Sequence, residues 1–267
     1  MPFPDPDLTP VTTLLCDADG TLFASEEPAF AASVSVANAC LEQLGVTERL
    51  TAEQFRLAAN GKSFRASITE IARTHGATVP PADLDAWVVQ ENEVVTRHLA
   101  DVLVPDTGVS GPLRAVAQDL GLALVTSSAL TRIDACLEAA ALADLFPEQR
   151  RFSAQDSLPV PTSKPDPAVY QLTLRELGLD PSAALAVEDA VAGAQSAVAA
   201  GIRTVGMLCF VPAQERAQRV LDLPQVGVSV LADSWAELGA LLQRSRTGEA
   251  QTPVPQVTSE SGTEVSA

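Results

Sequence analysis

Aromatic, histidine and basic residues are scarce in this chain. Of its 267 residues, two are tryptophan, one is tyrosine and two are histidine, while lysine and arginine together number 17. The 34 aspartate and glutamate residues leave a formal net charge of −17. This charge disfavours nucleic acids and anionic membranes as partners, because both are themselves negatively charged. It also means that a phosphorylated small molecule would need a local cation in order to bind.

Paired cysteines and long apolar runs are absent from the sequence as well. No apolar stretch approaches the ~20 residues that a membrane-spanning helix needs. We expect no secretory signal, since residues 1–10 contain neither a basic residue nor an apolar core. The cysteines are far apart and lie in apolar surroundings, so we expect buried free thiols and a reducing, cytoplasmic location. They are Cys16, Cys40, Cys136 and Cys209.

An apolar stretch near the N-terminus ends abruptly in two carboxylates. Residues 11–16 form a short stretch that is β-branched in part and apolar on both faces, which predicts a buried parallel strand. Asp17 and Asp19 follow, and the alternation of side chains along a strand would point both the same way from its carboxyl end. Ligands bind at this end in open α/β sheets. Two adjacent acids repel each other unless a cation or proton lies between them, and Gly20 permits the sharp turn that must follow.

Helical periodicity without a convincing strand extends from residue 25 to about residue 103. From residue 104 onward, apolar strands alternate with helices of ~10 residues, which predicts βαβ units and a parallel sheet. The insertion after the first strand is too long to be a loop. We therefore predict an α/β fold, with a doubly wound Rossmann-like parallel core at residues 1–24 and 107–245 and an all-helical cap domain at 25–106. Residues 246–267 are rich in Ser, Thr, Pro and Glu and are expected to form a disordered tail.

Local patterns give approximate bounds for the individual elements. Beyond the first strand, strands are predicted at residues 122–125, 151–153, 183–187, 202–205 and 226–231. The predicted helices include residues 51–59, 63–75, 109–120 and 234–242. One charged residue, Glu91, falls on the apolar stripe of a helix that opens at Pro81. We attribute its position to helix curvature or fraying, with a cavity beside the helix as the alternative.

Two later strands and one loop place further polar groups near the same sheet edge. Thr126 and Ser127 end one strand, Glu188 and Asp189 end another, and a loop carries Lys164. Because the carboxyl ends of parallel strands share one edge, we expect these side chains to meet the two aspartates of the first strand. Carboxylates from separate strands, with a backbone oxygen, suit Mg²⁺. A hydroxyl and N–H groups at a helix start suit a phosphate, and a lysine adds charge for it.

Together these residues resemble the four motifs of the haloacid dehalogenase superfamily. The matching segments are Asp17-Ala18-Asp19-Gly20-Thr21-Leu22, Thr126, Lys164-Pro165-Asp166-Pro167 and Glu188-Asp189. Their order and spacing are similar to the branch with a helical cap inserted after the first motif, which includes β-phosphoglucomutase, phosphoglycolate phosphatase and sugar- or polyol-phosphate phosphatases. The resemblance covers about residues 11–242. It implies a phosphatase that hydrolyses small phosphomonoesters and takes a small phosphorylated metabolite as its substrate.

The resemblance also implies a role for each residue. Asp17 would attack phosphorus and form an aspartyl-phosphate, while Asp19 would protonate the leaving alcohol and then take a proton from water. Mg²⁺ would be held by the Asp17 carboxylate, the Asp19 backbone carbonyl and Asp189. Glu188 would help directly or through water. The transferring phosphoryl group would be bound by Thr126, Ser127 and Lys164.

In the predicted cap, Gly61-Lys62-Ser63 is similar to the substrate-specificity loop of this branch. Gly61 and Lys62 are therefore expected to meet the leaving group, together with Arg65, although a single basic residue is commonly plain solvated surface. His75 and His98 have no partner of recognised spacing, and we assign them no role.

The residues around the first motif distinguish a phosphatase from other functions of this fold. Many relatives continue the first motif with Asp-Ser-Glu and a later histidine, whereas this chain has Ala24-Ser25-Glu26 and Ala29. Losing those polar groups favours a phosphatase over the alternative, a β-phosphoglucomutase-like phosphosugar mutase. Asp19 speaks against dehalogenation, because the dehalogenase branch lacks the second acid, and retention of every acid speaks against a non-catalytic scaffold. We expect the protein to be a monomer or a weak homodimer.

Overall fold

The sheet is built around the first predicted strand. The computed structural model describes residues 8–59 and 63–247. Within those ranges, six strands form one parallel sheet in the order β3-β2-β1-β4-β5-β6. This arrangement confirms the predicted doubly wound α/β fold class. The strands are β1 (Thr13–Cys16), β2 (Gly121–Thr126), β3 (Arg151–Ser153), β4 (Ala184–Glu188), β5 (Arg203–Met207) and β6 (Val230–Ala232).

β1 lies between β2 and β4 and is buried on both faces. Leu14 and Cys16 pack into the hydrophobic cluster formed with α5, α6 and α10, whereas Leu15 packs into the cluster formed with α7 and α8. Burial on both faces explains why this strand is apolar without alternation. The helices of this part are α5 (Thr107–Val116), α6 (Leu130–Ala139), α7 (Ala168–Leu177), α8 (Val191–Ala199), α9 (Ala213–Gln225) and α10 (Trp235–Thr247), with short 3₁₀ helices at Glu148–Arg150 and Pro181–Ala183.

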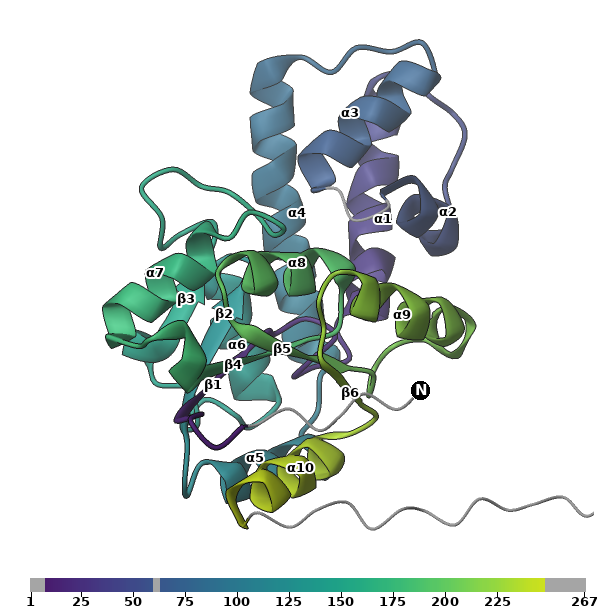
Figure 1. Ribbon diagram of the computed structural model, residues 1–267. Helices are drawn as coiled ribbons and strands as arrows, with labels where there is room; N and C mark the ends of the chain where they lie inside the picture. The colour runs from purple at the N-terminus through teal and green to yellow at the C-terminus, as the bar shows by residue number, and fades with distance from the viewer. Residues whose placement is uncertain (1–7, 60–62, 248–267) are drawn as a thin grey trace, which may run out of the picture.

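Helices α1 to α4 follow β1 and stand together on one side of the sheet (Figure 1). Their apolar stripes bury one another in a separate hydrophobic cluster that includes Leu41, Phe55, Ile68 and Trp87. The inserted helical cap is therefore present, while its predicted limits at residues 25 and 106 stay a prediction. The cap helices are α1 (Glu26–Gln43), α2 (Ala52–Ala59), α3 (Phe64–Thr74) and α4 (Pro81–Val102).

Glu91 lies on the buried side of α4 for a reason that the sequence did not reveal. Its side chain accepts a hydrogen bond from Ser33 Oγ on α1 and lies 3.3 Å from the Arg132 guanidinium on α6. Arg132 also donates to Asn92 Oδ1 at 2.7 Å. A buried charge requires such partners. Curvature or fraying was therefore the wrong explanation: Glu91 joins two cap helices to a helix of the core.

The segment between β5 and α10 differs most from the prediction. Only Leu223 of α9 is buried, so this helix lacks the apolar stripe by which helices are recognised. The strand predicted at residues 226–231 is wrong in its first half, where the chain ends α9 and turns through Gly227 at φ +97°. Pairing with β5 begins only at Ser229, whose N–H donates to the Thr204 oxygen at 3.1 Å, and the strand register starts at Val230.

The bounds of α5 and α10 are also shifted. Asp106 Oδ1 accepts a hydrogen bond from the Gly108 N–H at 2.7 Å, which starts α5 at Thr107, before the predicted residue 109. The helix ends at Val116, before the predicted residue 120. α10 continues to Thr247, so the first two residues of the predicted disordered tail are helical. The remainder of that tail lies outside the described residues.

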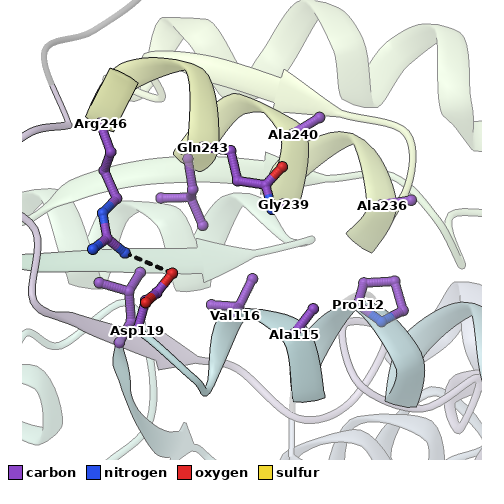
Figure 2. Close-up of a pocket in the computed structure, with 11 residues that line it drawn as sticks. Pro112, Ala115, Val116, Asp119, Ala236, Gly239, Ala240, Gln243 and Arg246 are labelled. Atoms are coloured by element: carbon purple, nitrogen blue, oxygen red, sulfur yellow. Dashed lines mark ion pairs between the residues drawn. The ribbon is translucent and has the colours of Figure 1, made fainter. Parts of the chain in front are cut away.

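Helices α5 and α10 pack side by side, and their small residues leave a shallow groove between them (Figure 2). The groove has a volume of about 250 Å³ and is lined in part by Ala115 and Gly239. A Cβ on Gly239 would lie 3.8 Å from Val116 Cγ2, an ordinary contact distance. An ion pair of 3.0 Å between Arg246 and Asp119 lies at one end of the groove.

All four cysteines are free thiols, as predicted, although Cys209 is only half-buried. Its Sγ donates to the backbone oxygen of Thr21 at 3.7 Å. Burial raises the pKa of Cys209 to about 12, and the nearby Asp189 adds to the shift. Across the described part of the chain, none of the helices combines the length and apolar character needed to cross a bilayer.

Candidate active site

The turn after β1 places the first carboxylate at the carboxyl end of the sheet. The Asp17 N–H donates to the Val187 oxygen of β4 at 3.0 Å, so the backbone of Asp17 continues the strand pairing. Gly20 then adopts φ +79°. A Cβ at Gly20 would lie 2.4 Å from Asp189 Oδ2. The position therefore requires glycine both for its backbone angle and for the close approach of an acid from another strand.

One buried lysine joins the acids of two strands. Lys164 Nζ lies 2.5 Å from Asp17 Oδ1 and 2.7 Å from Glu188 Oε1, and it donates to the Val125 oxygen at 2.8 Å. Burial alone would lower the pKa of Lys164. The two carboxylates outweigh burial and hold this pKa above its ordinary value, so the ammonium stays charged.

Three buried carboxylates lie close together, and Lys164 contacts two of them. Asp17, Glu188 and Asp189 can each offer an oxygen atom such that all of these atoms lie within 4.8 Å of one another. Burial raises the pKa of Asp17 and of Asp189, and it raises the pKa of Glu188 to about 7. Neighbouring acids add to each shift, because the two nearby cations, Lys164 and Arg219, are fewer than the three carboxylates. Hard oxygen donors with uncompensated negative charge fit a divalent cation such as Mg²⁺.

Two residues that the sequence did not single out hold Glu188 in place. The Tyr170 hydroxyl on α7 donates a hydrogen bond to Glu188 Oε1. Gly193 on α8 leaves room for the same carboxylate, because a Cβ there would lie 1.8 Å from Glu188 Oε2. Tyr170 is the single tyrosine of the chain. A buried tyrosine needs a hydrogen-bond partner for its hydroxyl. A lone tyrosine among the apolar residues of a helix was therefore the signal that could have pointed to Tyr170.

Asp19 faces a different set of partners from the acid cluster. Its Oδ1 accepts a hydrogen bond of 2.6 Å from Ser25 Oγ, and its Oδ2 accepts one of 2.7 Å from Ser128 Oγ. The three-carboxylate cluster does not include the Asp19 side chain. The predicted roles, in which the Asp19 carboxylate donates and accepts protons and only its backbone carbonyl binds a metal, stay predictions.

The loop after β2 brings hydroxyl and N–H groups next to Asp19 and Lys164. Thr126 Oγ1 accepts a hydrogen bond from the Ser128 N–H at 3.0 Å, and Ser127 Oγ accepts one from the Lys164 N–H at 3.1 Å. Thr126 is buried, and Ser127 is half-buried. The sequence did not lead us to assign a role to Ser128, although it directly follows Thr126 and Ser127.

A cleft of about 690 Å³ lies between cap helices α1 and α2 and the core, beside Gly20. Its charged lining is dominated by acids, with one guanidinium from α2. Burial raises the pKa of Glu26 there, against the lowering effect of Arg219. The charged lining residues are Glu26, Glu27, Glu53, Arg56 and Glu215.

Arg65 and His75 each lie beside an acidic residue of the cap. Gly61 and Lys62 lie outside the described residues. Arg65 pairs with Asp85 at 2.6 Å within the cap, and both side chains are exposed. His75 lies 3.2 Å from Glu48, also within the cap.

Comparisons with known proteins assign a family to this arrangement. The sequence profile described as haloacid dehalogenase-like hydrolase matches residues 11–201. The chain belongs to the haloacid dehalogenase-like hydrolases. Protein CbbY of Cereibacter sphaeroides is 28% identical over 247 residues, covering 86% of this chain and 95% of that protein. The plasmid CbbY protein of Cupriavidus necator is 32% identical over 257 residues, covering 85% of this chain and 94% of that protein.

Solved structures of haloacid dehalogenase-like proteins share the fold. CbbY from Rhodobacter sphaeroides in complex with phosphate matches with a TM-score of 0.67 and 25% identity, covering 87% of this chain and 99% of that one. A family hydrolase from Deinococcus radiodurans with bound phosphate and sodium matches with a TM-score of 0.65 and 24% identity, covering 89% and 97%. The predicted superfamily and enzyme class, a phosphoric monoester hydrolase, are confirmed.

One polar contact of this haloacid dehalogenase-like site lies on an element that was not predicted at all. Arg219 on α9 donates from Nη1 to the backbone oxygen of Asp189, and the same nitrogen lies 3.6 Å from Asp189 Oδ2. Since α9 carries almost no apolar pattern, nothing in the sequence indicated that this arginine would lie at the site.

Proposed function

We propose that this hydrolase is a Mg²⁺-dependent phosphatase that acts on sugar or polyol phosphates through an aspartyl-phosphate at Asp17. The observation that carries the proposal is the contact of buried Lys164 with Asp17 and Glu188, next to Asp189. The relatives support the substrate class. A mutant of CbbY from Rhodobacter sphaeroides has been solved with xylulose-(1,5)bisphosphate.

Asp17 is the proposed nucleophile. One of its carboxylate oxygens forms a bond to phosphorus while the bond from phosphorus to the substrate oxygen breaks. Lys164 opposes the burial-driven rise in the pKa of Asp17, and its charge lowers the repulsion between the carboxylate and an incoming phosphate. A divalent cation held by Asp17, Asp189 and the Asp19 carbonyl, with help from Glu188, would neutralise further charge during this approach.

Asp19 is the proposed general acid and base. In its protonated form it gives a proton to the leaving alkoxide, which departs as an alcohol. The ionised form then takes a proton from the water that attacks phosphorus, releasing inorganic phosphate and free Asp17. Ser25 and Ser128 orient both carboxylate oxygens, and because hydroxyl groups can donate or accept, they can serve either protonation state.

The transferring phosphoryl group is proposed to bind Thr126, Ser127 and Lys164. The Thr126 hydroxyl accepts from a loop N–H and keeps its own proton available for a phosphate oxygen. In the cap, Gly61 and Lys62 are proposed to contact the leaving group. We also propose that the enzyme works in the cytoplasm as a monomer or weak homodimer, which its free thiols suit.

The test is a screen of pentose, hexose and polyol phosphates for release of inorganic phosphate. Release should need Mg²⁺, stop with EDTA and fall by about 1,000-fold or more in Asp17→Asn, because no nucleophile remains. If Asp17→Asn hydrolyses p-nitrophenyl phosphate like the parent, the proposed mechanism is wrong. If a sugar phosphate isomerises without releasing phosphate, the enzyme is the mutase instead.

A further inference from the structure

A row of ion pairs connects the cap with the candidate metal site. Arg56 on α2 pairs with Glu215 on α9 and with Glu53 of its own helix at 2.9 Å. Glu215 Oε2 also lies 3.4 Å from Arg219 Nη2. Arg219 in turn donates to the backbone oxygen of Asp189. Glu215 therefore shares one carboxylate between an arginine of the cap and an arginine of the core.

The row becomes steadily more buried toward the site. The side chains of Arg56 and Glu215 are 29% and 27% exposed, that of Arg219 is 16% exposed, and that of Asp189 is 4% exposed. Partly buried pairs are less screened by salt than surface pairs, so a change at one end acts on the next group. The Arg219 guanidinium also lies 3.6 Å from Asp189 Oδ2, so it faces the carboxylate as well as the backbone oxygen of that residue.

We infer that Glu215 is a positioning residue that couples docking of the cap to the placement of Asp189. While the cap is docked, Arg56 engages Glu215 Oε1, and Arg219 remains on the Asp189 carbonyl. When Arg56 is removed, the full charge of Glu215 acts on Arg219 alone and draws its guanidinium away from Asp189. This inference depends on the proposed function, because it takes Asp189 to be a metal ligand.

The coupling has a consequence for metal binding that a purely local site would not show. Binding free energies at two coupled sites are reciprocal, so a cap that improves the metal site is itself held down by the metal. A substitution in the cap should therefore weaken Mg²⁺ binding even though Arg56 contacts none of the acid cluster. The effect should depend on the Glu215 carboxylate.

Isothermal titration of the substrate-free full chain with Mg²⁺ measures this coupling directly. Arg56→Gln should weaken Mg²⁺ binding by about fivefold or more, a typical size for coupling between two sites. In a Glu215→Gln background, adding Arg56→Gln should change the dissociation constant no further. Arg56→Lys keeps a positive charge for Glu215 and should bind Mg²⁺ more tightly than Arg56→Gln. The matched control is Arg49→Gln, which removes an exposed cap arginine paired with Glu42.

The possible outcomes are distinct. The inference is overturned if Arg56→Gln leaves the dissociation constant unchanged or lowers it, if the change persists in the Glu215→Gln background, or if Arg49→Gln has the same effect. Asp189→Asn separates this failure from that of the proposed function. If Asp189→Asn leaves Mg²⁺ binding intact, the proposed metal site is wrong; if it abolishes binding while Arg56→Gln has no effect, only the coupling is wrong. Circular dichroism melting verifies that each variant is folded.

Discussion

Gly193 lies directly against the carboxylate of Glu188, since a Cβ at residue 193 would stand 1.8 Å from Glu188 Oε2. Glycine inside a helix such as α8 costs ~1 kcal/mol relative to alanine. The missing side chain is what allows Glu188 to reach Lys164 and Tyr170. Backbone packing on one helix therefore sets the position of an acid on a neighbouring strand.

Gly193→Ala should lower both activity and stability, because the new methyl group displaces Glu188 from Lys164. We expect a loss of about tenfold or more in kcat/KM and a fall in Tm of a few degrees, the size produced by ~1–2 kcal/mol. Phosphate release and thermal melting measure these effects. Gly239→Ala in α10 is the control, since its Cβ meets only ordinary contacts and should leave Tm unchanged or raised. Equal behaviour of the two variants would contradict this account of Gly193.

Asp19→Asn should discriminate between substrates by their leaving groups. An alkyl alcohol needs the proton that Asp19 supplies, and p-nitrophenolate does not, because its conjugate acid is already acidic. Sugar phosphates should lose ~10²–10⁴-fold in kcat, the usual contribution of general acid–base catalysis, and p-nitrophenyl phosphate should lose less in the phosphorylation step. Burst kinetics on p-nitrophenyl phosphate isolates that step. An equal loss with both substrates would count against Asp19 as the acid.

The metal-free protein should become less stable as the pH rises from about 5 to 7. The pKa of Glu188 is raised from 4.5 to about 7 by burial in the folded protein. Within this window the unfolded chain releases the proton that the folded chain keeps, so the unfolded state binds fewer protons and stability falls as pH rises. The loss should be on the order of 1–3 kcal/mol, given ~1.4 kcal/mol for each unit of pKa.

Urea unfolding in EDTA at several pH values measures that loss. Mg²⁺ should flatten the profile, because a cation replaces the proton as the partner of the acids. Asp17 and Asp189 have pKa values raised in the same direction and should act together with Glu188. A stability that rises with pH in EDTA would show that the acids are not as buried as described.

Glu91→Gln should weaken the attachment of the cap to the core. The substitution leaves the Arg132 guanidinium without its charged partner, while the hydrogen bond to Asn92 remains. Removing one member of a buried pair costs ~3–5 kcal/mol, and the partial exposure of Arg132 reduces this to ~1–3 kcal/mol. Denaturant unfolding measures the difference. Arg49→Gln removes an exposed pair and should cost less than ~1 kcal/mol, so a comparable loss in both variants would contradict a special role for Glu91.

The parts that could be predicted are those with a periodic or local chemical signal. β3 was predicted with its observed bounds, and the alternation of strands and helices was enough for a parallel sheet. Asp17 follows β1 directly, and Glu188 and Asp189 lie at the carboxyl end of β4, so strand geometry alone placed these acids at one edge. α9 was missed because a helix with one buried side chain has no apolar stripe. β6 was placed too early because the β-branched Val226 suggested a strand, whereas the strand itself begins at Val230.

By itself, the sequence determined which chemical groups stand at the ends of the strands, because hydrophobic periodicity and residue order are properties of the chain alone. Only the tertiary structure decided which charged groups form ion pairs. Arg219 lies far from its partner Asp189 along the chain, and Glu215 lies far from its partner Arg56. Such contacts depend on how helices pack on the sheet, and packing is a property of the whole core. The same reason explains Glu91, whose partner Arg132 comes from a different part of the fold.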